Sequence, residues 1–168
     1  LRKELNLLRS DNNTYRLVHG EGDHLPGLII DLYGDTAVIQ AHSVGMHRDL
    51  ELIMAALKDV MATEGLNHIY YKSEGTLPFK AELGAQDGYL WGGEQTDAIA
   101  LENGLQFQID WLRGQKTGFF IDQRENRKLL EQLAAGRRML NMFCYTGGFS
   151  VYGLRGGASL VDSVDSSS

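Results

Sequence analysis

Apolar and polar residues alternate in short runs through the first half of the chain. Runs of strand length cover residues 15–18, 28–32 and 37–41, with turn residues between them at 26–27 and 33–35. Apolar side chains then recur at helical spacing between residues 46 and 61, and residues 68–72 return to a strand pattern. The pattern predicts a small α+β domain of a few strands and one helix. We interpret the methionines of that helix (Met46, Met54 and Met61) as core residues.

A connector and a hairpin follow. Residues 74–97 are rich in glycine and acidic residues and contain only scattered apolar positions, which favours a connector. Residues 99–102 and 105–111 alternate on either side of Asn103-Gly104, a dipeptide that strongly favours a hairpin turn. We therefore divide the chain into a central domain with its connector, residues 1–97, and the start of a second domain, residues 98–168.

The last part of the chain has the pattern of a strand, a glycine turn, a helix, a second strand and an acid. The apolar run 139–143 precedes Gly147-Gly148, helical spacing covers 149–154, and the run 160–164 ends at Asp165. Asp165 follows Gly147 by 18 residues. Nucleotide-binding βαβ units place a ribose-binding acid at a similar spacing of about 20 residues. This part of the sequence predicts a nucleoside site.

The turn lacks the residues that bind phosphate. A dinucleotide turn needs a third glycine at a fixed offset, and a P-loop adds a lysine followed by serine or threonine. Neither is present around Thr146-Gly147-Gly148-Phe149. A ligand with ribose and no phosphate fits better, and S-adenosylmethionine is the common one. A βα turn that binds nothing is the alternative interpretation.

A second candidate segment runs from residue 116 to residue 135. Thr117-Gly118 predicts a turn, Asp122 an N-cap, and residues 123–135 a helix whose Leu129, Leu130 and Leu133 face a core. We expect the donor side chains in its first turns to be exposed and able to reach a cofactor carboxylate or an RNA phosphate: Gln123, Arg124, Asn126 and Arg127. A surface helix start without a ligand is the alternative.

Charge is unevenly distributed. The formal net charge of −6 argues against a chain that binds nucleic acid over its whole surface. Residues 111–138, however, carry seven basic and three acidic side chains, whereas residues 82–110 carry six acids and no base. Basic charge therefore concentrates beside the nucleoside motif, where RNA phosphates would lie, although a solvated helix face gives the same pattern.

Composition excludes several other classes. No apolar run approaches the roughly 20 residues of a membrane span, and the polar start is no signal peptide. A single cysteine, Cys144, excludes an internal disulfide and favours the cytoplasm. The five histidines have no metal-ligand spacing, so no metal site is predicted.

Several motifs together carry a family resemblance. The segments 116–127, 140–150 and 163–167 closely resemble bacterial class I S-adenosylmethionine-dependent RNA methyltransferases of the ribosomal large-subunit methyltransferase I type, which make 5-methylcytosine. Residues 17–31 look like the start of that family's middle domain. The resemblance runs from about Tyr15 to the last residue and is thinnest between residues 74 and 97.

The resemblance implies an α/β fold: a small α+β central domain, then the N-terminal part of a Rossmann-like methyltransferase domain. Its cofactor is S-adenosylmethionine, and its partner is ribosomal RNA. The implied cofactor contacts are Lys116, Thr117, Gly118, Phe119, Gln123, Asn141, Phe143, Tyr145, Thr146, Gly147, Gly148, Asp165 and Ser166. Candidate RNA contacts are Arg113, Arg124 and Arg127.

The same resemblance makes this chain an interior piece of a longer enzyme. It reaches only the second strand of the family's methyltransferase sheet, so we expect the catalytic cysteine after residue 168 and an RNA-binding PUA domain before residue 1. We predict no catalytic residue here, an inactive piece and possible homodimers, and we interpret Cys144 as a packing residue. The alternatives are a non-catalytic RNA- or cofactor-binding module and a methyltransferase of the same fold with another substrate.

Overall fold

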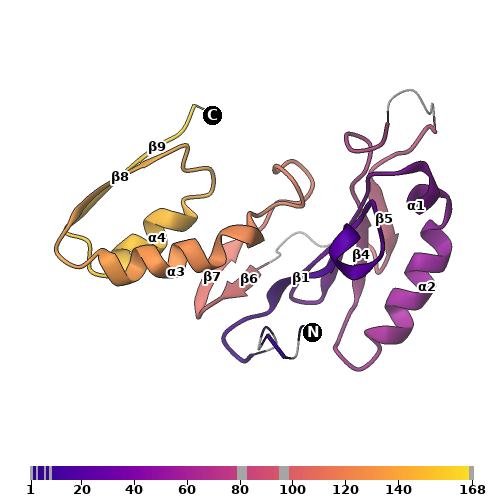
Figure 1. Ribbon diagram of the computed structural model, residues 1–168, viewed down its shortest axis with the longest axis horizontal. Helices are drawn as coiled ribbons and strands as arrows, with labels where there is room; N and C mark the ends of the chain where they lie inside the picture. Colours follow the sequence, from indigo (N-terminus) through magenta and orange to yellow (C-terminus); the bar gives the residue numbers. More distant parts are fainter. Residues whose placement is uncertain are drawn as a thin grey trace. The chain divides into compact units, whose positions relative to one another are not determined.

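The computed structural model describes residues 2, 4, 5, 7, 9–78, 83–94 and 99–166. The chain forms two compact units, Leu1–Phe119 and Phe120–Ser168, and each is described by itself (Figure 1). The predicted boundary between residues 97 and 98 lies outside the described residues and stays a prediction. No helix in the described ranges is long and apolar enough to cross a membrane.

The first unit contains a five-stranded sheet in the order β1-β2-β3-β4-β5. The strands are β1 Thr14–His19, β2 Leu28–Tyr33, β3 Thr36–Ala41, β4 His68–Tyr71 and β5 Gly88–Trp91. The β3–β4 pair is parallel and the other pairs are antiparallel. The predicted strands are therefore confirmed. The edge strand β5 is a correction, because it lies in the predicted connector.

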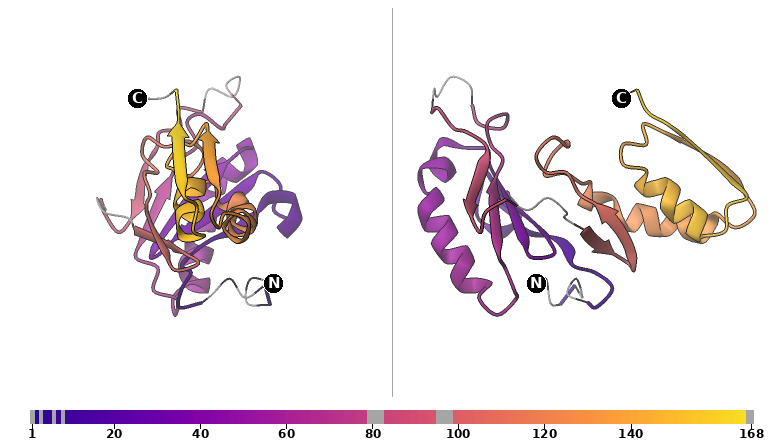
Figure 2. Two further views of the ribbon diagram at one scale, coloured as in Figure 1. Left: turned by 90° about the vertical axis from the view of Figure 1, so that its left-hand side faces the viewer. Right: turned by 180° about the vertical axis from the view of Figure 1, so that it is seen from behind.

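Two helices form the crossover between the parallel strands β3 and β4. The single predicted helix is in fact α1, Val44–Arg48, and α2, Leu50–Val60, with Asp49 between them. Both helices lie on one face of the sheet (Figures 1 and 2). Met61 belongs to the hydrophobic core with side chains of β2, β3 and β4, and the partly buried Met46 and Met54 pack against that core. The core interpretation of the methionines is thus confirmed.

The predicted hairpin is also present. Strands β6, Ile99–Glu102, and β7, Leu105–Gln108, pair antiparallel around Asn103 and Gly104. Both turn residues have positive φ, 49° and 78°, as a type I′ turn requires. Hydrogen bonds to residues near β1 hold the hairpin in the first unit: the Asn13 amide donates to Leu101 O and the Gly104 amide to Asp11 O.

The second unit is built from α3 Arg124–Leu133, β8 Arg138–Met142, α4 Gly148–Arg155 and β9 Leu160–Val164. Strands β8 and β9 pair in parallel, as the left view of Figure 2 shows, and α4 connects them. The predicted strand, turn, helix and strand are confirmed. Helices α3 and α4 are joined by an ion pair in which Arg155 donates two hydrogen bonds of 2.6 Å to Glu131.

The start of α3 differs from the prediction. Residues Ile121–Gln123 form a 3-10 turn, the cap position of α3 is Gln123, and no side chain caps it, so Asp122 is not the N-cap. Two of the three predicted core leucines are wrong as well, because Leu129 and Leu133 are exposed, whereas Leu130 is half-buried. Arg124 and Arg127 occupy the buried face instead, and Arg127 donates to the Phe120 carbonyl at 3.0 Å.

Candidate cofactor-binding site

The carboxyl ends of β8 and β9 bring the predicted glycine turn and the predicted acid to one edge. Parallel strands end at the same edge of their sheet, so the turn after β8 and Asp165 after β9 become neighbours. A hydrogen bond of 2.7 Å from the Tyr145 amide to Asp165 Oδ2 confirms this. The Cys144 amide also donates to Val164 O at 3.2 Å.

The turn between β8 and α4 has an unusual backbone. Phe143, Tyr145 and Gly147 all have positive φ, at 57°, 49° and 76°. Such conformations are costly for residues with a Cβ and concentrate at ligand sites. The Gly147 amide donates to Cys144 O at 2.7 Å, and Gly147 forms the N-cap of α4. The first amides of α4 are therefore directed toward this turn, where a polar ligand group could accept from them.

A polar cluster lies beneath the turn. Asn141 Nδ2 donates to Ser150 Oγ at 2.8 Å, and Ser150 Oγ shares a hydrogen bond of 2.6 Å with Ser163 Oγ. Asn141 and Ser163 are register partners on β8 and β9, which brings the three side chains together. Asn141 was predicted as a cofactor contact, whereas the two serines were missed. The cluster joins β8, α4 and β9 and fixes the base of the site.

Replacing Gly147 with alanine is expected to cost about 1 kcal/mol of the free energy of unfolding, because a Cβ is strained at φ 76°. A Cβ there would meet no atom within 4 Å, so no clash adds to this cost. The added methyl group would stand where a ligand approaches the turn. Calorimetric titration of the full-length variant with S-adenosylmethionine should therefore show an affinity loss of roughly tenfold or more. In free energy, this loss exceeds the cost in stability. Gly136→Ala is the matched control, because Gly136 also has positive φ and open space but lies before β8.

The aromatic and cationic surroundings of the turn come from α3 and the segment before it. Phe120 packs edge-to-face on Tyr145 with 5.3 Å between ring centroids. Arg127, only 2% exposed, lies over the rings of Phe149 and Tyr152. Arg124 is 7% exposed. The expectation that these arginines are exposed donors is wrong, and their role as RNA contacts stays a prediction.

The predicted contacts Lys116, Thr117, Gly118 and Phe119 belong to the first unit. Thr117 is fully buried, and its hydroxyl donates to Asp31 Oδ2 at 2.6 Å while it contacts Tyr33 Oη at 2.8 Å. Burial, and after it the Asp31 carboxylate, raise the pKa of Tyr33. Tyr33 therefore stays protonated and donates to Thr117. A cofactor contact at Thr117 could come only from its backbone.

Of the other predicted contacts in this segment, Phe119 and Gly118 are packed in the first unit and Lys116 is exposed. Phe119 is 2% exposed and packs on Phe107. A Cβ on Gly118 would lie 2.8 Å from Ile109 Cγ2, so only glycine fits there. Lys116 and Arg113 are exposed. Within the described residues, no group of three or more histidine, cysteine or carboxylate side chains could hold a metal.

The second unit thus combines a parallel βαβ arrangement, a left-handed glycine turn and a carboxylate after the second strand. The residues fit the nucleoside part of S-adenosylmethionine: Asp165 offers acceptors for ribose hydroxyls, and the glycine turn leaves open space at the start of α4. These features define a nucleoside-binding α/β unit of the class I methyltransferase type. The sequence model of the S-adenosylmethionine-dependent methyltransferase family matches residues 82–168. The chain belongs to this family, which confirms the predicted fold class and cofactor class.

Named relatives and solved structures agree with this assignment. The ribosomal RNA large subunit methyltransferase I of Tolumonas auensis is 40% identical over 165 residues, which are 97% of this chain and 41% of that protein. A solved Streptococcus mutans protein, described as a SAM-dependent methyltransferase, superimposes with a TM-score of 0.83 at 32% identity over 99% of this chain and 42% of its own. A second solved chain, a methyltransferase complexed with SAH, has the same TM-score and identity and is covered to 41%. The chain therefore spans about two fifths of the length of the proteins that it matches.

Proposed function

We propose that the protein containing this chain transfers a methyl group from S-adenosylmethionine to ribosomal RNA, and that the acceptor is carbon 5 of a cytosine. The observation that carries the proposal is the Asp165–Tyr145 contact, which joins the acid after β9 to the glycine turn in one nucleoside site. The name of the Tolumonas auensis relative supports RNA of the large subunit as the substrate. We place the activity in the cytoplasm, where bacterial ribosomal RNA lies, and a homodimer remains a prediction.

Within this scheme the chain binds and orients the cofactor. Asp165 accepts hydrogen bonds from the ribose hydroxyls with its carboxylate, while Oδ2 also holds the Tyr145 amide. The left-handed turn lets the ligand approach the first amides of α4. Phe143, 81% exposed, offers an aromatic surface beside the turn. Bound S-adenosylmethionine supplies an electrophilic methyl group.

Methylation at carbon 5 of cytosine also needs a nucleophile. A thiolate adds to C6, C5 then becomes nucleophilic enough to accept the methyl group, and the C5 proton leaves as the thiolate is released. Cys144 is a poor candidate. It is half-buried in the turn after β8, and its Sγ contacts the Tyr145 carbonyl at 4.0 Å. We therefore assign it to packing and place the nucleophile outside this chain.

Incubation of the full-length protein with labelled S-adenosylmethionine and unmodified ribosomal RNA tests the proposal. Label should enter the RNA, and mass-spectrometric mapping should find 5-methylcytosine. A protein that binds S-adenosylmethionine and RNA but transfers no label would be a binding module. Label on another base or on protein would contradict the cytosine assignment.

A Cys144→Ser variant should retain methyl transfer within about twofold and should still form a covalent adduct with RNA that contains 5-fluorocytosine, because serine preserves the size of a half-buried side chain. Loss of the adduct with cofactor binding intact would identify Cys144 as the nucleophile. Calorimetric titration of the variant with S-adenosylmethionine provides the control for folding.

A further inference from the structure

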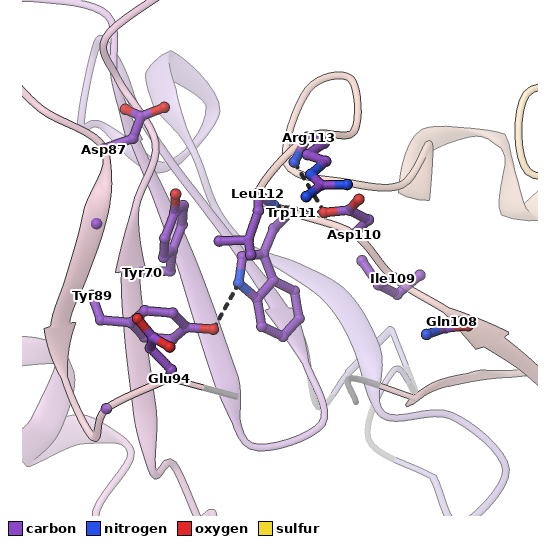
Figure 3. Close-up of a pocket in the computed structure, with 12 residues that line it drawn as sticks. Tyr70, Asp87, Tyr89, Glu94, Gln108, Ile109, Asp110, Trp111, Leu112 and Arg113 are labelled. Carbon is purple, nitrogen blue, oxygen red and sulfur yellow. Dashed lines mark hydrogen bonds between the residues drawn. The ribbon is translucent and has the colours of Figure 1, made fainter. Parts of the chain in front are cut away.

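A cavity of about 950 Å³ opens in the first unit beside the edge strand β5 (Figure 3). Tyr70 of β4 and Asp87 and Tyr89 from the β5 region line one side, and Asp110 and Trp111, which follow β7, line the other. Every lining residue belongs to the first unit, so the cavity is a property of that unit alone. The function derived from the glycine turn makes no use of it.

The aromatic walls of the cavity are fixed in place. Tyr70 and Tyr89 pack edge-to-face at 5.0 Å, and Trp111, 2% exposed, donates from Nε1 to Tyr89 Oη at 3.1 Å (Figure 3). Gly88 and Gly93 flank the Tyr89 segment, and a Cβ on either glycine would meet no atom within 4 Å. The half-buried Tyr89 ring is therefore oriented, with open space beside it for a flat ligand.

The hydroxyl of Tyr70 is accessible from the cavity. Tyr70 is only 6% exposed, yet across the described ranges its Oη has no hydrogen-bond partner, and the residue lines the cavity. Tyr70 Oη is not among the buried atoms that lack a partner in the described residues, so this hydroxyl is accessible from the cavity, where water or a ligand can bind it. Burial, and after it the Asp87 carboxylate, raise the pKa of Tyr70, which keeps its hydroxyl protonated at neutral pH. Tyr70 can thus donate to a ligand acceptor.

Two carboxylates near the aromatic walls each use one oxygen to accept hydrogen bonds from backbone amides. Asp87 Oδ1 accepts from the Ser73 and Glu74 amides at 2.6 and 2.8 Å. Asp110 Oδ1 accepts from the Leu112 and Arg113 amides at 3.0 and 2.9 Å. Neither Oδ2 has a hydrogen-bond partner among the described residues. Backbone amides therefore fix both acids in place, and the Oδ2 atom of each can accept a hydrogen bond from a ligand.

The Tyr89 ring, the two carboxylates and the Tyr70 hydroxyl are complementary to a planar ligand that carries amino donors and a neighbouring acceptor. A nucleobase with an exocyclic amino group has all three properties: a ring to stack on Tyr89, an amino group for a carboxylate, and a ring nitrogen or carbonyl for the Tyr70 hydroxyl. Arg113, the one cation among the described residues that line the cavity, is exposed, and the phosphate of the same nucleotide would lie beside it. We propose that this cavity binds one unpaired, amino-bearing base of the RNA substrate; this rests on the function proposed above.

A guanidinium group from a protein partner is the competing occupant, because it is also flat and rich in donors. The local charge favours a cation less than the lining carboxylates Asp87, Glu94 and Asp110 alone would suggest. The ammonium group of Lys72 donates to the carbonyls of Trp111 and Gly114 at 2.6 and 2.5 Å. Burial lowers its pKa, but the nearby charges of Asp87 and Asp110 act in the opposite direction. The positive charge of Lys72 therefore offsets part of the negative potential that would attract a cation.

Tyr70→Phe and Asp87→Asn in the full-length protein test the assignment. The first change removes only the hydroxyl that faces the cavity. The second keeps an oxygen for the Ser73 and Glu74 amides but puts an amino group in place of Oδ2. Each change should raise the KM for RNA by about fivefold to tenfold, the effect of one hydrogen bond, with the KM for S-adenosylmethionine unchanged. Asp59→Asn on the exposed side of α2 is the matched control.

A binding assay separates this proposal from the function on which it rests. Wild-type protein should bind a short single-stranded oligonucleotide more tightly when its central residue is cytidine than when it is uridine, because uracil opposes a carbonyl to the carboxylates. Asp87→Asn should abolish that preference. The proposal would be overturned if Tyr70→Phe and Asp87→Asn both kept the RNA affinity and the base preference of the wild-type protein. It would also be overturned if the two variants lost affinity for an arginine-rich peptide but not for RNA. Absence of methyl transfer by the wild-type protein would reject the proposed function. The oligonucleotide assay would still show whether the cavity binds an amino-bearing base.

Discussion

Replacing Asp165 with alanine in the full-length protein is expected to weaken S-adenosylmethionine binding by about 2–3 kcal/mol, because it removes the charged acceptor for two ribose hydroxyls. The change also releases the Tyr145 amide, which Asp165 Oδ2 holds at 2.7 Å. Isothermal titration calorimetry measures the loss directly. An unchanged dissociation constant would reject the role of Asp165 in cofactor binding.

Two further variants identify the cause of that loss. Asp165→Asn keeps an acceptor for the Tyr145 amide but has no charge, so it should bind the cofactor nearly as poorly as the alanine variant. Wild-type affinity in Asp165→Asn would mean that Asp165 acts by holding the turn. Asp162→Ala is the matched control, because Asp162 is an exposed acid on the same strand, β9.

The largest stability effect is expected for Arg16→Met. Arg16 forms two hydrogen bonds of 2.8 and 3.0 Å with Asp31, whose side chain is fully buried. Removal of the arginine leaves that carboxylate without its counter-charge, which should cost about 3–5 kcal/mol of the free energy of unfolding. Arg48→Met, at an exposed position in α1, should change it by less than about 0.5 kcal/mol.

Tryptophan fluorescence makes this measurement specific. The chain has two tryptophans, Trp91 and Trp111, and both belong to the first unit. Their emission during urea denaturation of the 168-residue chain therefore reports the unfolding of that unit. Equal midpoints for Arg16→Met and the unchanged chain would show that the Asp31 ion pair contributes nothing to stability.

Much of the fold could be predicted because its signals are local. The hairpin depends on Asn103-Gly104, and the second unit depends on apolar runs on either side of Gly147. The edge strand β5 could not be predicted. It has four residues, follows a glycine-rich segment, and pairs with β4 through a register shift between Ile69 and Tyr70. Its strand conformation depends on a neighbour and not on its own pattern.

The candidate site divides in the same way. Asp165 and the glycine turn could be identified because spacing along a βαβ unit determines where they lie. The burial of Arg127 could not be predicted, since α3 is strongly amphipathic and its charged residues suggest a solvated surface. The structure instead packs this arginine on Phe149 and Tyr152. A sequence shows that a residue is cationic but not that aromatic rings will cover it.

The hydrogen bond from Thr117 to Asp31 also has a consequence for the order of folding. It joins residues 86 positions apart, whereas β8 and β9 are joined by a single short helix. Closing so long a loop costs chain entropy before any contact is gained, so contacts of this kind tend to form late. We therefore expect the contacts of Asp31 with Arg16 and Thr117 to form after the folding transition state. Loss of these contacts would then mainly raise the rate of unfolding and leave the rate of folding nearly unchanged. The contacts would thus slow the unfolding of the first unit.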